Sequence, residues 1–421
     1  MRRSLCIFED KKTKNFYPLT LTRPVFDLRC GITTLYEKLI KRNGEEVYLV
    51  CREYLREVIS QKLRRARVNK LEELKMRDLF FVNGRVLSFE DEIGLEGDEE
   101  IGISGEDIIY ARLNQGTLKS LSFVHPEEIE EVLNRAKEKV KVREVKAKIA
   151  RYLWDLVNWN GEAIEEDFKE KGKVGVEGEV KEGVYLISPE KIYIGKGTKI
   201  EPGVILNAAG GCIYIEEEVR IRPPTIIDGP CYIGKGTVVD GAKIREGCSV
   251  GPVCRIAGEI EESIFYAYTN KHHDGFIGHA YIGEWVNLGA LTTNSDLKNT
   301  YGNVKVYVGG KNLDTKEMKV GSFIGDHTKT GIGTLLNTGC VIGVASNLFG
   351  GGVTPKFVPS FSWGGKNFSE NKLSKVIEVA RVVMRRRDVV QTEADRALLR
   401  KVYELTKKER EEFLSSEYKL E

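Results

Sequence analysis

The sequence lacks the marks of several classes of protein. Its eight cysteines include no CxxC pair and no short ligand spacing, which argues against a zinc ribbon and against a disulfide framework. It also has no apolar run long enough for a signal peptide or a membrane span, because the weakly apolar stretch 4–8 is followed at once by two acidic residues. We therefore expect a cytoplasmic protein with reduced thiols and no membrane partner.

The sequence also has little excess charge of either sign. The 65 lysines and arginines nearly balance the 63 aspartates and glutamates, which leaves a net charge of +2. A chain this balanced has no long-range field that would collect nucleic acid or an anionic surface. We therefore expect no nucleic-acid partner, and an acidic ligand must be bound by a local cluster of cations.

Glycine is unevenly distributed, and its distribution marks domain boundaries. Nine of the 43 glycines precede Gly172, 34 lie from Gly172 to Gly365, and none follows. At 421 residues the chain is too long for one compact core, so two or three domains are expected. We predict an α/β domain at 1–125, a charged helical segment that completes or links it at 126–172, a repeat domain at 173–365 and a helical tail at 366–421.

Short apolar runs alternate with helix-like stretches in the first part of the chain. This alternation predicts an α/β layer domain. The predicted strands are Leu5–Phe8, Val47–Cys51, Leu79–Val82 and Ile108–Ala111, and the predicted helices are Ile32–Lys41 and Glu53–Leu63.

Aliphatic residues recur at six-residue steps in the glycine-rich region, and glycine often follows them. A period of six is too short for a helical repeat, but it suits one flat side of a triangular β coil with glycine at a strained corner. The steps predict a left-handed parallel β-helix of hexapeptide repeats from about residue 190 to about residue 350. The series are Ile194, Ile200, Leu206; Ile244, Val250, Ile256; and Ile324, Thr330, Leu336, Ile342, Leu348.

The residues after Gly365 have a helical pattern. Leu373–Arg387 and Thr392–Phe413 are predicted as two helices, the second of which begins with a cap made by Thr392 and Asp395. We expect these helices to cover the C-terminal end of the β-helix. The arginine run 385–387 is either a solvated face or a contact to phosphate.

Histidines gather where the six-residue register breaks. His272, His273 and His279 lie in or just after the stretch 266–275, which fits no inward aliphatic step and is therefore predicted to leave the coil as a loop. A histidine there can act as a general base, because its unperturbed pKa lies near working pH. Two alternatives remain open, a structural loop and a metal site formed by the three histidines with Asp274.

The segment from His273 to Ala290 resembles the acetyltransferase half of the bifunctional N-acetylglucosamine-1-phosphate uridyltransferase/glucosamine-1-phosphate acetyltransferase family. The resemblance implies that His273 is the catalytic base. It also implies that Asn287 binds substrate. Asn294 matches a further substrate-binding asparagine if two residues are deleted.

Two positions depart from that family's pattern. Phe276 stands where the family has a substrate-contacting tyrosine, and the family's sugar-phosphate lysine is not aligned, although Lys271 lies close by. Lys271 is therefore a further candidate substrate-binding residue. The identity of the sugar does not follow from the sequence.

The first part of the chain and its flanks resemble a divergent group of sugar-1-phosphate nucleotidyltransferases fused to such β-helices. The segments that carry this resemblance are Tyr17–Gly31, Trp154–Asp167 and Val383–Arg386. The resemblance implies an α/β nucleotidyltransferase-like fold for the N-terminal domain. Ordinary members bind the nucleotide phosphates with a glycine-rich loop, whereas this chain has Lys11–Asn15 at that place.

The resemblance also suggests which residues replace that loop. Arg23 and Arg29 are candidates for binding the triphosphate, and Asp10, Asn83 and Asp107 are candidate ligands of Mg²⁺. A domain that only binds a sugar nucleotide, without catalysis, is the alternative.

Together these resemblances imply a transferase of nucleotide-sugar biosynthesis. It would acetylate an amino-sugar 1-phosphate with acetyl-CoA on the β-helix and transfer a nucleotide from an NTP on the N-terminal domain, giving a product such as UDP-N-acetylglucosamine. The family resemblance also implies a homotrimer. One alternative is a nucleotidyltransferase alone, such as one that acts on glucose 1-phosphate and thymidine triphosphate, with a structural β-helix. Another is a non-catalytic sugar-nucleotide-binding scaffold.

Overall fold

The computed structural model describes residues 3–41, 46–90 and 93–415. The chain forms two compact units, and the division after Tyr152 differs from the predicted boundaries at 125 and 172. The reason is that 126–152 contributes strands to the first unit, whereas the helices that follow belong to the second. The first unit comprises Met1–Phe16, Thr22–Leu28 and Thr33–Tyr152, and the second comprises Tyr17–Leu21, Arg29–Ile32 and Leu153–Glu421.

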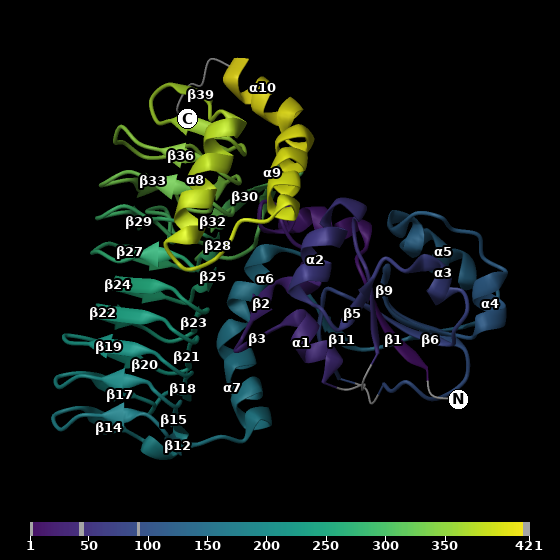
Figure 1. Ribbon diagram of the computed structural model, residues 1–421, viewed down its shortest axis with the longest axis horizontal. Coiled ribbons are helices and arrows are strands. Elements are labelled where there is room, and N and C mark those ends of the chain that lie inside the picture. The colour runs from purple at the N-terminus through teal and green to yellow at the C-terminus, as the bar shows by residue number, and fades with distance from the viewer. Residues whose placement is uncertain (1–2, 42–45, 91–92, 416–421) are drawn as a thin grey trace. The chain divides into compact units, whose positions relative to one another are not determined.

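The first unit is built on a seven-stranded sheet with the order β10-β8-β9-β6-β1-β4-β5 (Figure 1). Strands β1, β4, β5 and β6 are parallel, and β9 runs antiparallel to β6 and β8. The predicted α/β character is confirmed. The strands are β1 (Ser4–Phe8), β4 (Val47–Val50), β5 (Ala66–Val68), β6 (Leu79–Asn83), β8 (Glu100–Ser104), β9 (Asp107–Leu113) and β10 (Lys141–Glu144).

Apolar side chains that alternate along these strands pack against short helices. Cys6, Phe8 and Phe81 share one buried cluster with Leu118 and Leu133 of the helices α4 and α5. The first helix begins with a capping box, in which the Thr34 hydroxyl and the Glu37 carboxylate bind each other's backbone N–H groups. The helices are α1 (Leu35–Ile40), α2 (Arg56–Lys62), α3 (Leu71–Leu74), α4 (Gln115–Lys119) and α5 (Ile129–Ala136).

The strand order of the first unit reverses between β1 and β6. The chain runs from β1 through β4 to β5 on one side, and then returns to form β6 on the other side of β1. In open α/β sheets the crevice at such a reversal, beyond the carboxyl ends of the strands, is where ligands bind. Asp10 follows β1 and Asn83 ends β6, so both lie at this crevice.

The second unit contains a parallel β-helix that extends from Gly175 to Gly364, which confirms the predicted repeat domain (Figure 1). Its first ladder pairs one strand from each of ten coils. The ladder consists of β12 (Gly175–Val176), β15 (Ile192–Ile194), β18 (Ile213–Ile215), β21 (Cys231–Ile233), β23 (Cys248–Val250), β25 (Ile264–Ala267), β28 (Tyr281–Glu284), β32 (Phe323–Ile324), β35 (Val341–Ile342) and β37 (Phe357–Val358).

Two further faces complete the coils. In the middle of the array β22 (Val238–Ile244) and β24 (Arg255–Glu261) bend around a corner and contribute to both faces. The second face contains β13 (Glu179–Val180), β16 (Lys199–Ile200), β19 (Arg220–Arg222), β26 (Asn270–Lys271), β33 (Lys329–Thr330), β36 (Asn347–Leu348) and β38 (Ser362–Gly364). The third contains β14 (Tyr185–Ile187), β17 (Ile205–Asn207), β20 (Ile226–Asp228), β27 (Phe276–Gly278), β29 (Thr293–Asn294) and β34 (Leu335–Leu336).

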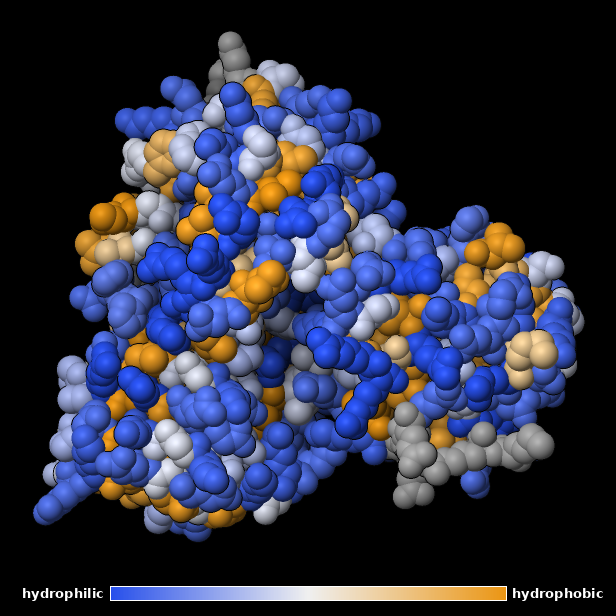
Figure 2. Space-filling view, in the orientation of Figure 1, coloured by the Kyte–Doolittle hydropathy of each residue, from blue (hydrophilic) through white to orange (hydrophobic). Residues whose placement is uncertain are grey.

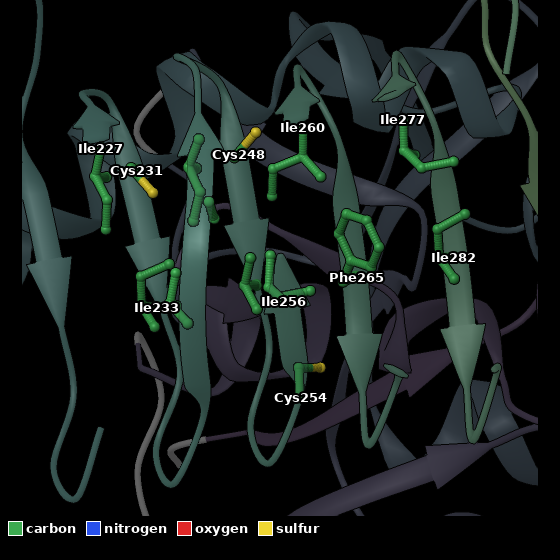
Figure 3. Packing of buried hydrophobic residues seen from close by; sticks show 14 of the residues in the cluster. Ile227, Cys231, Ile233, Cys248, Cys254, Ile256, Ile260, Phe265, Ile277 and Ile282 are labelled. Atoms are coloured by element: carbon green, nitrogen blue, oxygen red, sulfur yellow. The ribbon is translucent and has the colours of Figure 1, made fainter. Parts of the chain in front are cut away.

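The interior of the β-helix is filled by columns of aliphatic side chains. Ile233, Phe265 and Ile282 come from successive parts of the first ladder and point into the same interior (Figure 3). Each is 0% exposed. Stacking identical positions in this way buries apolar area in every coil and protects the backbone of each strand between two neighbours.

Lys271 and Asn294 are two of the inward positions that break these columns with polar side chains. Lys271 pairs with Ile256 in the second face and is 2% exposed, and Asn294 pairs with Leu336 in the third face and is 5% exposed. Buried polar groups need hydrogen-bond partners. Both residues find theirs in the backbone next to the histidines, as described below.

The register break predicted over 266–275 is shorter in the structure. Residues as far as Ala267 belong to β25, and Asn270 and Lys271 form β26, so only His272–Gly275, the corner loop, leaves the ladder. The predicted segment was too long because only aliphatic residues were expected at inward positions. Lys271 occupies such a position with its methylene chain.

Helices flank the β-helix. α6 (Leu153–Asn158) and α7 (Asn160–Lys171) belong to this unit, and Ile164 and Phe168 of α7 pack in one buried cluster with Tyr193, Tyr214 and Tyr232 from consecutive coils. The prediction that 126–172 is helical throughout is wrong, since β10 and β11 (Ala147–Ile149) lie within it.

The tail forms three helices rather than the two predicted. They are α8 (Leu373–Arg385), α9 (Glu393–Leu405) and α10 (Lys407–Ser415), and the break at Thr406 lets Phe413 pack edge-on against Phe357 and Phe368 of the last coil. The predicted capping box of Thr392 and Asp395 is present. On the face in Figure 2, hydrophobic residues form small separate groups among hydrophilic ones. No described helix has the length and apolar character that crossing a membrane requires.

Candidate functional site

The corner loop His272–Gly275 presents His273 to solvent. It connects β26 on the second face to β27 on the third, and it holds four residues where the coil below has only Ala257 and Gly258. His273 is exposed, whereas the Nε2 atom of the half-buried His272 lies 4.0 Å from the Asp240 carboxylate. Of these two histidines, His273 is therefore the one that a substrate can reach most freely.

Lys271 fixes this loop from inside the coil. Its Nζ donates to the carbonyl oxygen of Ala257 at 2.9 Å and to the carbonyl oxygen of His273. The predicted contact of Lys271 with a sugar phosphate does not match this placement, because the ammonium points into the coil and binds the backbone. Lys271 positions the carbonyl group of His273, so it acts on the loop rather than on a substrate.

Substituting Lys271 by methionine should preserve the packing but leave both carbonyl oxygens without their donor. Burial lowers the pKa of Lys271 from 10.5 to about 8. Between these values the unfolded chain binds more protons than the folded chain, so the stability of the wild type should rise with pH relative to Lys271→Met, by up to about 3 kcal/mol. Unfolding midpoints of both proteins at about pH 7 and about pH 10 test this. Identical pH dependence in the two would contradict it.

Asn294 and Asp296 hold the second histidine of this region. The Asn294 side chain accepts from the backbone N–H of Gly278 at 2.9 Å and donates to its carbonyl oxygen at 2.8 Å. The neighbouring His279 places Nδ1 2.9 Å from the Asp296 carboxylate. Burial alone would raise the pKa of Asp296, but the hydrogen bond and charge of His279 lower it. Asn294, predicted to bind substrate, therefore lies inside the coil as a backbone clamp.

The metal alternative for these histidines has no support in the geometry. His272 faces Asp240 and His279 faces Asp296, in different directions along the coil. Across the described ranges of the chain, no three histidine, cysteine, aspartate or glutamate side chains come together in a way that could hold a metal ion. All eight cysteines are buried and free of disulfides.

A shallow groove leads to one side of the corner loop. It has a volume of about 660 Å³ and follows the same corner through five coils, from Gly203 past Thr225, Ala242 and Gly258 to Phe276. Asp274 and Gly275 of the corner loop line its end. An extended ligand that lies in this groove would end within the corner loop.

A pocket lies between the second face and α8. We call it the α8 pocket. It encloses about 240 Å³, and its walls include the stacked rings of Tyr268 and Trp285, whose centroids are 4.1 Å apart. Its other lining residues are Asn270, Val286, Asn287, Lys329, Val383, Arg386 and Arg387.

The candidate residue Asn287 is exposed in the α8 pocket and is tied to its cations. Arg387 donates to the side-chain oxygen of Asn270 at 2.8 Å, and the Asn270 amide donates to the Asn287 side-chain oxygen at 3.2 Å. Asn270 is only three residues before His273. The row of hydrogen bonds therefore links the turn after α8 to β26, the strand that precedes the corner loop.

Positive charge accumulates around the α8 pocket without acidic neighbours. Burial lowers the pKa of Arg387, and the charge of Arg386 lowers it further, while burial lowers the pKa of Lys329 to about 8. No acidic side chain lines the pocket within the part of the chain that the structure describes. A bound anion would stabilise the charged form of Arg387, and phosphate meets guanidinium groups with two parallel hydrogen bonds.

The α8 pocket continues into a second, more apolar cavity. This cavity of about 490 Å³ shares Lys329 with the α8 pocket and is lined by Val376 and Val379 of α8 and by Trp363. Together the two spaces offer a cationic and aromatic end and an apolar end along the same helix. A ligand with a phosphorylated ring system and an extended chain suits this combination.

The three candidate metal ligands of the first unit do come together, but around an arginine. Arg85 is 0% exposed, and its Nε lies 3.0 Å from both carboxylate oxygens of Asp10. One Nη donates to Asp107 at 2.6 Å and the other to the carbonyl oxygen of Ala150 at 2.7 Å. The Lys12 ammonium lies 2.8 Å from the same Asp107 oxygen.

Asn83 completes this arrangement, which we call the Arg85 network and define as Asp10, Lys12, Asn83, Arg85 and Asp107. Asn83 donates its amide to Asp10 at 2.9 Å and accepts the backbone N–H of Arg85 with its oxygen at 3.0 Å. Burial alone would raise the pKa of Asp107, but Arg85 and Lys12 lower it. Asp10 and Asp107 raise the pKa of Arg85 despite its burial.

Mg²⁺ does not fit this network. The ion requires oxygen ligands at about 2.0–2.1 Å in near-octahedral geometry. Here the Asp10 oxygens, one Asp107 oxygen and the Asn83 oxygen already accept hydrogen bonds from the protein. Two cationic side chains also balance the two carboxylates, so the network is neutral before any ion arrives.

The two arginines predicted to bind a triphosphate lie in different units. Arg23 belongs to the first unit and is 3% exposed, and its carbonyl oxygen accepts a hydrogen bond from the Arg52 side chain. Arg29 belongs to the second unit, where its guanidinium lies 5.2 Å from the ring centre of Tyr232 and donates to the carbonyl oxygen of Ile32. Arg23 and Arg29 therefore do not belong to one compact unit.

The segment that replaces the glycine-rich loop is a 3₁₀ helix, Lys11–Phe16. Its lysines form ion pairs within the first unit, Lys11 with Glu131 at 2.6 Å and Lys12 with Asp107. A phosphate cradle needs free backbone N–H groups that approach the anion closely. In this segment the N–H of Lys11 donates to the carboxylate of Glu130 instead.

Sequence reasoning missed Arg85, Trp285 and Lys329. A local signal existed for Arg85, because a single arginine directly after Asn83 and Gly84 places a charge at the end of a buried strand. For Lys329 the signal was a lysine next to Thr330, the only polar member of the six-residue series. Trp285 had no comparable signal, since its partners come from other coils.

Comparison with known proteins agrees with this architecture. Residues 5–173 match the family model described as sugar nucleotidyl transferase. This match extends beyond Tyr152 through α6 and α7, which pack with the second unit. The chain therefore has an N-terminal segment similar to sugar nucleotidyl transferases and a parallel β-helix.

Curated relatives match part of this chain. The bifunctional sugar-1-phosphate nucleotidylyltransferase/acetyltransferase of Sulfurisphaera tokodaii is 32% identical over 160 residues, which are 35% of this chain and 38% of that protein. The bifunctional protein GlmU of a Synechococcus species is 28% identical over 205 residues, 42% of this chain and 41% of that protein. This chain is therefore similar to these bifunctional proteins over part of its length. The chain spans about two fifths of the length of these curated relatives.

Solved structures with some likeness include UDP-N-acetylglucosamine acyltransferases. The one from Campylobacter jejuni is 17% identical, covers 58% of this chain and 92% of its own chain, and has a TM-score of 0.30. The one from Arabidopsis is 15% identical, covers 59% of this chain and 85% of its own, and has a TM-score of 0.25. Because these TM-scores are low, the fold is assigned from the strand ladders described above and not from these structures.

Proposed function

We propose that this chain is a transferase of nucleotide-sugar biosynthesis that acetylates an amino-sugar 1-phosphate with acetyl-CoA on its β-helix. The observation that carries the proposal is the α8 pocket, a cationic and aromatic space whose lining includes Asn270, three residues before His273. The first unit would transfer a nucleotide from an NTP to the sugar 1-phosphate. The family match over 5–173 supports this second activity.

The acetyl transfer follows from the chemistry of a histidine in the corner loop. The sugar amine attacks the thioester carbonyl, a C–N bond forms, and His273 removes the proton that the amine loses. The C–S bond then breaks, and the departing thiolate takes up a proton, so that free CoA and the acetamide leave. His273 is exposed and its backbone carbonyl is fixed by Lys271, which keeps the loop in one conformation.

The α8 pocket and its apolar extension would hold the donor. Arg386, Arg387 and Lys329 supply charge for the phosphates of acetyl-CoA, and Tyr268 and Trp285 supply a planar surface for its adenine. Asn287 would bind the acceptor at the mouth of the pocket. The groove that ends at Phe276 offers a second approach to the corner loop, open to the sugar.

Two coupled assays test the proposal. Acetyl-CoA with glucosamine 1-phosphate should release free CoA thiol, and a panel of NTPs with N-acetylglucosamine 1-phosphate should release pyrophosphate for one base. Thiol release without pyrophosphate would reduce the proposal to its acetyltransferase half. Pyrophosphate without thiol would indicate a nucleotidyltransferase with a structural β-helix, and neither product with any sugar phosphate tested would indicate a binding scaffold.

We propose in addition that the active form is a homotrimer in the cytoplasm. Exposed apolar side chains on one edge of the coils, Ile332 and Val353 among them, support self-association. Free, buried cysteines are consistent with a reducing compartment. A monomer in light scattering that retained full acetyl transfer would contradict the trimer.

A further inference from the structure

Charged side chains of the protein itself occupy the crevice at the carboxyl ends of β1 and β6. Three carboxylates lie there, Glu9, Asp10 and Asp107, and each is buried. Glu9 binds Arg52 through both oxygens, with Arg52 Nη2 3.1 Å from one and Arg52 Nε 3.1 Å from the other. Asp10 and Asp107 bind Arg85 and Lys12 in the Arg85 network.

The charges of this crevice cancel. Two guanidinium groups and one ammonium face three carboxylates, and the three Arg85 nitrogens all donate to oxygen atoms of the protein. A divalent cation that joined Asp10 and Asp107 would have to displace the guanidinium from both. Removing one member of a buried charged set while leaving the rest typically costs about 3–5 kcal/mol.

We infer that Arg85 takes the place of a divalent cation in this domain, so that a phosphorylated ligand binds to the first unit without a metal ion on Asp10 and Asp107. The inference rests on the proposed function only for the class of ligand, a nucleoside triphosphate or a sugar phosphate. Lys12 is a cation of the Arg85 network that reaches the surface, since its side chain is 37% exposed. It is the member of the Arg85 network that an incoming phosphate would meet.

The direct test measures the binding of Mn²⁺ to the full chain by the loss of the free-ion paramagnetic resonance signal. We expect the wild type and the Asp107→Asn variant to bind the same amount of Mn²⁺, with and without UTP. One Mn²⁺ per chain in the wild type that disappears in Asp107→Asn would overturn the inference. This comparison does not require any change to Arg85.

A gain-of-function variant provides the second arm. Arg85→Met keeps an unbranched apolar side chain in place and frees the oxygens of Asp10, Asp107 and Asn83 for a metal ion. We expect 1 mM Mn²⁺ to raise the melting temperature of Arg85→Met by roughly 5 °C or more and that of the wild type by less than about 1 °C. Equal shifts in both would count against the inference. If Arg85→Met does not fold, the comparison of Mn²⁺ binding between the wild type and Asp107→Asn still tests the inference.

Nucleotide binding separates this inference from the proposed function. With excess EDTA, the affinity for UTP should stay within about threefold of the affinity with Mg²⁺, a difference under about 1 kcal/mol. A loss of UTP binding in EDTA that Asp107→Asn reproduces with Mg²⁺ present would overturn the inference but leave nucleotidyl transfer standing. If no nucleotide binds under either condition, the proposed role of this domain fails, and the Mn²⁺ comparison still tests the inference.

Discussion

Acetyl transfer should fall by roughly 10²- to 10⁴-fold when His273 is replaced by asparagine, the range that a general base contributes. The substitution keeps a polar side chain of similar size in the corner loop but removes the group that accepts the proton. The side chain of His273 is exposed, so the fold and the binding of acetyl-CoA should survive. The measurement is the rate of thiol release at saturating acetyl-CoA, with nucleotidyl transfer in the same protein as the internal control.

The neighbouring histidines provide matched controls. His272→Asn alters the same corner loop but removes a ring that faces Asp240, and His279→Asn removes one that is bound to Asp296. Neither change should reduce acetyl transfer by more than about tenfold, since neither group is placed to take the proton. A full loss in His279→Asn with normal turnover in His273→Asn would move the base to the His279–Asp296 pair. Normal turnover in all three variants would remove this region from the acetyl-transfer site.

Much of the fold could be predicted because the features that determine it are local. In the β-helix each inward residue is separated from the next by six residues, so Ile324, Thr330 and Leu336 state the register without knowledge of any distant contact. The cap of Thr392 and Asp395 is local in the same way and was placed correctly. Strand β10 was missed because Lys141–Glu144 is exposed and charged at the edge of its sheet, which leaves no apolar alternation to detect.

The sites were harder to predict because their contacts span long stretches of the chain. Arg85 and Asp10 are 75 residues apart, and Arg387 and Asn270 are 117 apart. A single sequence shows that Asp10 and Asp107 are acidic, but it does not show that an arginine lies between them. Similarly, Lys271 and Asn294 look like surface ligands in a linear motif. The direction of their side chains depends on the stacking of coils.

Arg387→Met is expected to raise the KM for acetyl-CoA by roughly 10- to 100-fold, the range for a lost charge-assisted contact to phosphate. Arg387 follows the end of α8 and donates to Asn270. Burial and the charge of Arg386 lower its pKa, and a bound anion would stabilise its charged form. Methionine keeps an unbranched side chain, although a shorter one, and removes the guanidinium group with its charge and hydrogen bonds. The turnover number at saturating acetyl-CoA should change little, because the corner loop is not altered.

Two comparisons make this prediction specific to phosphate. Arg385→Met carries the same change of charge two residues earlier, at the end of α8, but Arg385 is exposed and does not line the α8 pocket, so the KM of this variant should stay within about twofold of the wild type. S-acetylpantetheine is a donor without phosphates or adenine, and its KM should be the same in Arg387→Met and in the wild type. An equal rise in KM for both donors would mean that the pocket has collapsed around Asn270. An equal rise in KM in both arginine variants would indicate a general effect of charge. Only a loss confined to Arg387→Met and to the phosphorylated donor places the nucleotide of acetyl-CoA in the α8 pocket.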